Sequence, residues 1–300
     1  MALTEKQMIA RQQSVGGSDV PAILGISPFK SAVDVFFEKT HEMRQVENSA
    51  MEAGHMLEPA VIDWAITRLE VKEFSWSSAN VRRTKILVSE SGFEIPAHAN
   101  LDFMFINTEP QAPRNALEAK TTGMPQYWGS EWTDEVPDHV LVQCLWQAMI
   151  ADLDKVYVAV LIGDHGFNLK MYVVEPSDYE EECSEIKERV GSFWNKNVME
   201  GVAPEESAPR IETLKKIIRT PGKSKELSEM NLQSWLQAKD EVSTASKKEK
   251  ELRATLISEL SDAEIGESAH GQLTYHEYNR KEYTVSPSKY RAIRWRPRKD

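Results

Sequence analysis

Strand-like and helix-like patterns alternate through the middle of this 300-residue chain. Five short runs rich in apolar and β-branched residues are bounded by turns that contain Pro, Asn and Gly, as is typical of β-strands. The strand-like runs are 84–89, 93–106, 115–122, 154–163 and 167–175. The first three predict a meander, and "DHVLVQCLWQAMIADL" (138–153) follows it with the apolar spacing of a helix. We therefore expect an α/β fold with a mixed central sheet flanked by helices.

Further helices are predicted on both sides of this region, where apolar residues recur at helical spacing. These segments are 4–13, 31–40, 51–69 and 177–201. Between the first two, Ser18 and Asp19 follow two glycines and resemble a helix N-cap, and Gly25 closes a short helix. A capped helix start exposes backbone N–H groups, so this turn is a candidate anion site.

A Pro- and Glu-rich stretch, "GVAPEESAPR" (201–210), is the best candidate for a domain boundary. It separates a predicted core over 1–204 from an extension over 205–300. In the extension, a long polar segment over 223–260 is helix-prone with a thin apolar stripe, and "GQLTYHEYNRKEYTVS" (271–286) predicts a hairpin of two short strands. The expected architecture is thus an α/β core followed by a helical and β-hairpin extension.

The net charge of −11 is unevenly distributed along the chain. Residues 1–204 contain 17 Lys and Arg against 31 Asp and Glu, whereas residues 205–300 contain 19 against 16. The end is strongly basic, with eight basic residues and one acid in 280–299. Aromatic residues are interleaved with these cations, which suits contact with a nucleic acid as well as a solvated terminus or a closed sheet edge.

Composition disfavours two other classes of protein. No run approaches the roughly 20 apolar residues that span a bilayer, and the start lacks the layout of a secretory signal. We therefore expect a cytoplasmic protein without a membrane partner. The two cysteines are too few for a zinc or iron–sulfur framework and are not spaced as a redox pair.

Three charged residues stand out in the predicted meander: Asp102, Glu118 and Lys120. Alternate residues of a strand share a face, so Glu118 and Lys120 point the same way, and the neighbouring strand can bring Asp102 beside them. Two close carboxylates repel unless a cation bridges them, and hard oxygen ligands suit Mg²⁺ or Mn²⁺. With a lysine beside the cation, this set suits hydrolysis of a phosphodiester. Solvated strand residues would give the same spacing.

Six sequence blocks that follow one another between residues 8 and 204 are much more specific for a protein family than the three charged residues alone. They are "RQQSVGGSDVPAILGISPF", "GHMLEPAVIDWA", "HANLDF", "ALEAKTT", "VLVQCLWQAMIADLDKVYVAVLIG" and "FWNKNVMEGVAP". In this order they resemble the PD-(D/E)XK nuclease superfamily and, within it, the YqaJ-type viral recombinase family, which includes phage lambda exonuclease. The resemblance implies a restriction-endonuclease-like core over the first two thirds of the chain.

The resemblance assigns roles by position. It places the metal-binding acids on Asp102 and Glu118, a further oxygen ligand on the carbonyl of Ala119, and the catalytic lysine on Lys120. It also places a helix-borne acid that completes or supports the metal site on Glu58. Without the resemblance, the pattern favours a helix surface residue facing water at Glu58.

Three more residues match functional positions of the family. Gln143 matches an active-site glutamine, and Gln147 shares its helical face one turn later but receives no assigned role. Arg11 and Ser18 match an arginine and a serine that hold a 5′-terminal phosphate. A guanidinium, a hydroxyl and helix amides together make a good phosphate site. The competing interpretations are a buried structural glutamine, an exposed arginine and a plain N-cap serine.

The resemblance implies a Mg²⁺-dependent deoxyribonuclease, with Mn²⁺ as a substitute. We expect a 5′-to-3′ exonuclease on linear double-stranded DNA that leaves 3′ single strands for an annealing protein during phage-type recombination. A homo-oligomer, such as a trimeric ring, in the bacterial host cell is also implied. The alternatives are a structure-specific or nicking endonuclease on the same fold, and an inactive DNA-binding or assembly module.

Two departures from the family pattern bear on these expectations. Phe103 replaces a glycine that often follows the catalytic aspartate, and its ring could narrow the space beside a metal. The long segment after residue 204 exceeds the compact exonuclease core, so assembly and substrate handling need not follow the ring.

Overall fold

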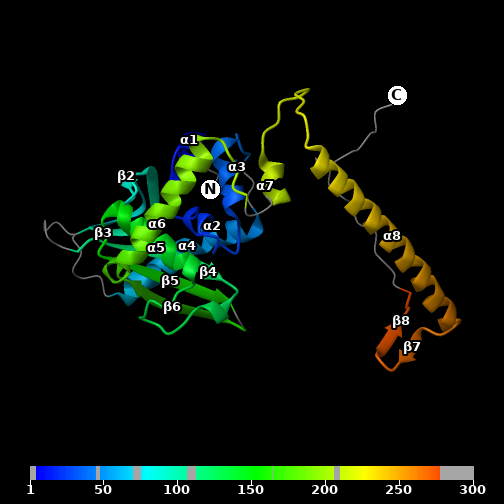
Figure 1. Cartoon of the computed structure of the whole chain (residues 1–300). Coiled ribbons are helices and arrows are strands. Elements are labelled where there is room, and N and C mark those ends of the chain that lie inside the picture. The colour runs from blue at the N-terminus through cyan, green and yellow to red at the C-terminus, as the bar shows by residue number, and fades with distance from the viewer. Residues whose placement is uncertain are drawn as a thin grey trace. The chain divides into compact units, whose positions relative to one another are not determined.

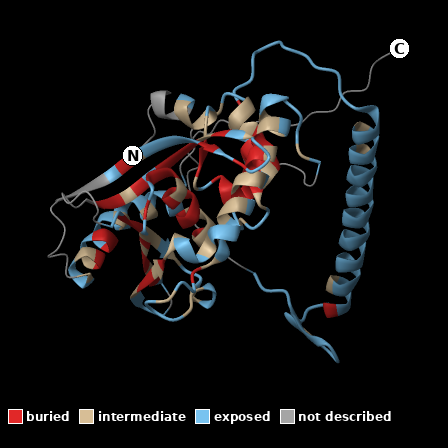
Figure 2. Cartoon of the chain, turned by 60° about the vertical axis from the view of Figure 1, so that its left-hand side comes forward, coloured by how far each residue is buried: buried red, intermediate tan, exposed pale blue. Residues whose placement is uncertain are grey.

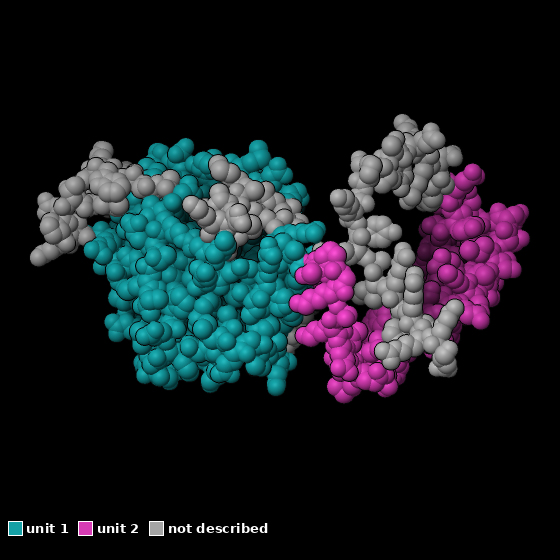
Figure 3. Space-filling model, turned by 90° about the horizontal axis from the view of Figure 1, so that it is seen from above, with its two compact units in different colours: residues 1–218 teal, residues 219–300 magenta. Residues whose placement is uncertain are grey.

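The computed structural model describes residues 5–44, 48–69, 76–106, 113–163, 165–205 and 210–277. They belong to two units, Met1–Ile218 and Arg219–Asp300 (Figure 3). The boundary expected at residue 204 falls inside the first unit. After that point the chain returns to pack helix α7 (Ile211–Lys216) against helix α3 (Ala32–Thr40) and to form a bridge between Met43 and Ile217.

The first unit is built on a mixed six-stranded sheet (Figure 1). Its strands are β1 (Val15–Gly16), β2 (Trp76–Val88), β3 (Glu94–Ile106), β4 (Asn115–Thr122), β5 (Lys155–Gly163) and β6 (Phe167–Val174). Strands β2, β3 and β4 form the predicted antiparallel meander, β5 runs parallel to β4, and β6 returns antiparallel to β5. The two-residue strand β1, which the sequence pattern did not indicate, pairs parallel with β3.

Helices cover both faces of this sheet, as expected for the fold class. The remaining helices of the first unit are α1 (Glu5–Gln12), α2 (Val20–Ile23), α4 (Ser49–Arg68), α5 (Asp138–Ala151) and α6 (Glu180–Phe193), with short turns η1 (Pro125–Tyr127) and η2 (Pro176–Tyr179) and a π-helical turn, Trp194–Met199. Helix α3 begins with a capping box between Ser31 and Asp34, and α4 begins at the cap Asn48. These caps satisfy backbone N–H groups that the first turn leaves free.

Two apolar clusters lie on opposite sides of the sheet. Helix α4 packs on β4 and β5 through Val61, Ile62 and Ala65. Helices α5, α6 and α2 enclose the larger cluster on the other side, where Trp146 is fully buried. Figure 2 shows that the buried residues gather within this layered unit. Polar residues that occur on these faces of the sheet are therefore exceptional.

The second unit contains helix α8 (Glu229–Leu260) and a small hairpin of β7 (Ile265–Ser268) and β8 (Gly271–Thr274). Helix α8 is largely exposed, and Leu260 at its end is buried. The sequence placed a hairpin over 271–286, but its first strand pairs with the preceding segment through the turn at 269–270. Residues 278–286 and the basic stretch 280–299 lie outside the described residues.

Among the described residues, none of the helices is both long enough and apolar enough to cross a membrane.

Candidate active site

Glu118 and Lys120 lie on β4 and face α5. Neighbouring Ala116 packs in the α5-side cluster and Leu117 in the α4-side cluster, which fixes the direction of the alternating side chains. The Glu118 residue is only 3% exposed, and its Oε1 accepts a hydrogen bond from Lys120 Nζ at 2.5 Å. The two charges therefore share a face, as the strand spacing predicts, and they form an ion pair.

Helix α5 contributes two amides to the same carboxylate. Gln143 donates from Nε2 to Glu118 Oε1 at 2.6 Å, and its Oε1 accepts from Lys120 at 3.1 Å. Gln147, one turn later, donates from Nε2 to Glu118 Oε2 at 2.7 Å. Both oxygens of Glu118 are thus oriented by neighbouring donors. A carboxylate offers about four acceptor positions, so the three hydrogen bonds leave room for a further ligand.

Asp102 reaches this cluster from β3, one residue before the Phe103–Leu117 pair of the β3–β4 ladder. Its Oδ2 accepts a hydrogen bond from the backbone N–H of Ala119 at 2.9 Å. Burial, and next the charge of Glu118, raise the pKa of Asp102 well above its usual range. The two acids are therefore close enough to repel one another through the protein interior.

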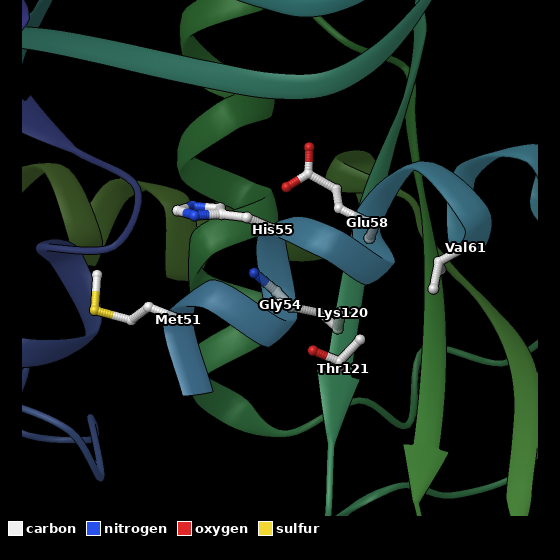
Figure 4. Close-up of a pocket in the computed structure, with 8 residues that line it drawn as sticks. Met51, Gly54, His55, Glu58, Val61, Lys120 and Thr121 are labelled. Carbon is white, nitrogen blue, oxygen red and sulfur yellow. The ribbon is translucent and has the colours of Figure 1, made fainter. Parts of the chain in front are cut away.

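Glu58 approaches from α4 across a pocket of about 240 Å³. The pocket is lined by Glu58, His55 and Gly54 of α4 and by Ala119, Lys120 and Thr121 of β4, among others (Figure 4). Helix α4 and strand β4 lie close together here, and a Cβ added at Gly54 would make an ordinary van der Waals contact with Thr121 Oγ1 at 3.7 Å. Burial raises the pKa of Glu58, and the charge of Glu118 adds to that shift.

Lys120 is held as a cation in this arrangement. Burial opposes a charged ammonium, but attraction by Glu118 and Asp102 outweighs it, so the pKa of Lys120 is raised. Hydrogen bonds to Glu118 and Gln143 direct its ammonium along the same side of β4. At neutral pH Lys120 can therefore donate hydrogen bonds and stabilise negative charge.

The donor set fits a hard divalent cation. Asp102 and Glu58 have raised pKa values beside the Glu118 carboxylate, and a cation would relieve this unfavourable accumulation of acids. In the part of the chain that is described, no three His, Cys, Asp or Glu side chains are grouped closely enough to hold a metal by themselves. Mg²⁺ usually takes only one or two carboxylates, and water and phosphate oxygens complete its shell. Asp102 and Glu118, with the Ala119 carbonyl and Glu58 nearby, make a set of that kind.

Arg11 and Ser18 stand at the two ends of a segment that is held by hydrogen bonds around the buried Asp19. Arg11 is half-buried at the end of α1, Ser18 is exposed in the turn after β1, and Asp19 is 1% exposed. Asp19 is the N-cap residue of α2, as the sequence pattern indicates, but its side chain makes no cap hydrogen bond. Pro21 lacks one of the two N–H groups that such a cap can use, and two lysines and the Gly16 N–H bind the carboxylate instead.

The anchor is a buried network centred on Asp19. Lys39 Nζ donates to Asp19 Oδ2 at 2.6 Å, to the carbonyl of Arg11 at 2.6 Å and to that of Ser14 at 2.8 Å. Lys30 Nζ donates to Asp19 Oδ1 at 2.6 Å. Burial alone would raise the pKa of Asp19, but the lysines and Arg11 hold it well below its usual range. The network therefore fixes the backbone that carries Arg11 and leads to Ser18.

This anchored segment lies directly against the carboxylate cluster. A Cβ added to Gly17 would be 3.1 Å from Gln143 Cγ and 3.8 Å from Gln147 Cγ. Ser18 is the next residue, so its turn borders the helix face that holds Glu118. The structure thus brings Asp102, Glu118, Lys120 and Gln143 into one cluster, with Glu58 across the pocket and Ser18 beside α5. In the described part of the chain, the Arg11 guanidinium makes no hydrogen bond or ion pair with that cluster.

Phe103 is not among the residues that line the pocket between α4 and β4. Its side chain packs in the α4-side cluster and meets Phe105 edge-on, with ring centroids 5.2 Å apart. The bulk that replaces the family glycine is therefore accommodated in the core.

Sequence reasoning left out two contributors to this region. Gln147 is 2% exposed and binds the second oxygen of Glu118, and its spacing of four residues from Gln143 was the available signal. The Lys39 anchor had no local signal, because Lys39 meets Asp19 across twenty residues of sequence. Long-range pairing of this kind becomes visible only once the fold is known.

The fold and this cluster define an α/β protein with a buried carboxylate–lysine centre on its central sheet. Residues 8–154 match the family described as the YqaJ-like viral recombinase domain. The chain is also 30% identical, over 275 residues, to the uncharacterized protein YqaJ of Bacillus subtilis (strain 168), with 87% of this chain and 80% of that protein covered. The chain belongs to the YqaJ-like viral recombinase family.

Solved structures with partial similarity include an alkaline exonuclease, LHK-Exo, from Laribacter hongkongensis. One crystal structure of that enzyme gives a TM-score of 0.43, and another, in complex with dAMP, gives 0.45. In both comparisons the sequence identity is 16%, and 66% of this chain and 94% of the other chain are covered.

Proposed function

We propose that this protein is a metal-dependent deoxyribonuclease whose reaction centre is Asp102, Glu118 and Lys120. The observation that carries the proposal is the pairing of a buried, fully oriented carboxylate with a charged lysine at 2.5 Å, beside a second acid with a raised pKa. Buried charges of this kind are costly unless they are paired. A solvated strand face would not bury Glu118 or recruit two glutamines to it.

Each residue of the centre has a proposed role. Asp102, Glu118 and the Ala119 carbonyl would hold Mg²⁺, or Mn²⁺ in its place, with Glu58 supporting the site from α4. When bound, such a cation supplies an activated water and neutralises charge on the phosphodiester. Lys120 stabilises the negative charge that develops on the phosphate, because it stays an ammonium.

The two glutamines hold the side chains of this centre in fixed positions. Gln143 contacts both Lys120 and Glu118, so it couples the position of the cationic group to that of the carboxylate. Gln147 fixes the other oxygen of Glu118. Such preorganised donors lose little freedom during the reaction, which is the basis of most electrostatic catalysis.

Arg11 and Ser18 are proposed to receive the 5′-terminal phosphate. Their segment is rigidly anchored by Asp19 and Lys39, and its Gly17 lies against Gln143. A phosphate held there would set the first phosphodiester near Glu118 and Lys120. This arrangement favours a 5′-to-3′ exonuclease on linear double-stranded DNA that leaves 3′ single strands. Such strands are the substrate of a single-strand annealing protein, and family resemblance adds a ring-shaped homo-oligomer to the proposal.

The experiment combines a Mg²⁺ titration with three substrates of one sequence: linear duplex with a 5′ phosphate, the same duplex without it, and a covalently closed circle. We expect Mg²⁺-dependent release of nucleotides from the 5′ end of the phosphorylated duplex, and its loss in Glu118→Ala and Lys120→Ala. Cleavage of the closed circle would establish an endonuclease instead. Indifference to the 5′ phosphate would remove the role of Arg11 and Ser18, and binding without hydrolysis would leave a DNA-binding module.

A further inference from the structure

Phe29 presents a large apolar ring to solvent near the candidate active site. Its residue is 65% exposed, and it lies in the turn between α2 and α3. Its ring meets His139 edge-on, with centroids 5.7 Å apart and an interplanar angle of 80°. An exposed aromatic side chain is common by itself, so its surroundings decide whether it has a function.

The backbone around Phe29 is fixed on both sides. The N–H groups of Phe29 and Lys30 donate to Ser27 Oγ at 3.2 and 3.4 Å. Arg210 donates to the carbonyls of Pro28, at 3.1 Å, and of Phe29. Lys30 is tied to the buried Asp19. The ring therefore projects from an ordered turn that shares its anchor with the Arg11–Ser18 segment.

His139 connects this ring to the carboxylate cluster. It lies in the first turn of α5, four residues before Gln143, so the two side chains share a helix face. Burial, and next the charge of Lys120, lower the pKa of His139. The aromatic pair of Phe29 and His139 thus stands on the side of α5 where Gln143 binds Glu118 and Lys120.

We propose that Phe29, supported by His139, forms a stacking platform for the nucleobase next to the phosphodiester that Glu118 and Lys120 act on. A nucleotide held by its phosphate places its base beside that phosphate, where an exposed phenyl ring offers an apolar face. Stacking is tolerant of sequence because every base has a π-face. The platform would therefore hold the terminal nucleotide without selecting its base. This inference rests on the proposed function and adds a nucleobase site to it.

The test measures binding, so it does not depend on cleavage. The full-length protein is titrated, with Ca²⁺ in place of Mg²⁺, with 5′-phosphorylated duplexes that carry either a normal or an abasic 5′-terminal nucleotide. The matched variants are Phe29→Ala, Phe29→Trp, and Ile86→Ala, which trims a 57% exposed apolar side chain on β2. Circular dichroism checks the fold of each variant.

Wild type is expected to bind the normal end about 5- to 150-fold more tightly than the abasic end, which corresponds to the usual range for stacking one base. Phe29→Ala should bring this ratio close to one, whereas Phe29→Trp and Ile86→Ala should keep it. A ratio of one in wild type, or an unchanged ratio in Phe29→Ala, would overturn the base platform. A ratio that depends on Phe29 in a protein that never cleaves DNA would support the platform and refute the nuclease.

Discussion

Replacing Lys39 by methionine is predicted to destabilise the first unit and to erase recognition of a 5′ phosphate. Methionine keeps an unbranched apolar stem of similar reach but removes the ammonium. That ammonium, on a side chain 3% exposed, donates at 2.6 Å to Asp19 and at 2.6 and 2.8 Å to two backbone carbonyls. The substitution leaves the buried Asp19 carboxylate with one of the two lysines that bind it.

The magnitude follows from burial. Removing one partner of a buried ion pair costs about 3–5 kcal/mol, because a charge remains without compensation. Lys30 still binds the other oxygen of Asp19, so we expect about 3 kcal/mol for Lys39→Met. Lys85→Met is the matched control, since Lys85 pairs with Asp152 at the same 2.6 Å with side chains 40% and 61% exposed. Such a surface pair contributes about 0–1 kcal/mol.

The assay is urea unfolding followed by circular dichroism, with the two lysine variants and the double variant Asp19→Asn/Lys39→Met. The double variant also removes the uncompensated negative charge of Asp19, so it should recover part of the lost stability. In cleavage assays, Lys39→Met should lose its preference for a 5′-phosphorylated end while it still cleaves an unphosphorylated end. The reasoning is refuted if Lys39→Met and Lys85→Met unfold at the same urea concentration and both keep the phosphate preference.

Three further perturbations test separate parts of the structure. Burial lowers the pKa of His98 to about 4, below its value in the unfolded chain. The free energy of unfolding should therefore fall by about 2–3 kcal/mol as the pH drops from about 6.5 to 4. His98→Gln should flatten this pH dependence, and an equally steep curve in the variant would contradict the prediction. In Gly16→Ala the new Cβ would lie 2.6 Å from His98 Nε2, so unfolding measurements should show a loss of about 1–3 kcal/mol in the free energy of unfolding. Gly54→Ala is the control, because its new Cβ meets only ordinary contacts and should leave stability unchanged or increased. Gln147→Leu removes the donor to Glu118 Oε2 and should lower the rate of nucleotide release about tenfold or more, so an unchanged rate would separate Gln147 from the reaction.

The sequence was informative where a local pattern determines geometry. Strand alternation correctly placed Glu118 and Lys120 on one face, and the meander brought Asp102 beside them. Helical spacing put Gln143 and Gln147 on one side of α5, although it did not show that both reach Glu118. Periods of two and 3.6 residues carry this information without any knowledge of the tertiary structure.

Features that depend on distant partners were not predictable in this way. The side chain of the N-cap residue Asp19 binds lysines 11 and 20 residues away, because charged ammonium groups attract a carboxylate more strongly than helix amides do. Strand β1 is only two residues long and exists through its pairing with Ala97 and His98. Strand β8 (271–274) pairs with the preceding strand β7, and the local sequence pattern did not show with which segment it would pair.

The central claim is that Lys120 and Glu118 form the reaction centre of a metal-dependent nuclease. The most direct test compares Mg²⁺-dependent nucleotide release from a 5′-phosphorylated linear duplex by wild type and by Lys120→Met, with duplex binding measured in parallel. We predict that wild type is active only with the cation, and that Lys120→Met is slower by about 100-fold or more, as for loss of a charge-stabilising group, while it still binds DNA. Equal rates for the two proteins, or release by wild type in the presence of a chelator, would contradict it.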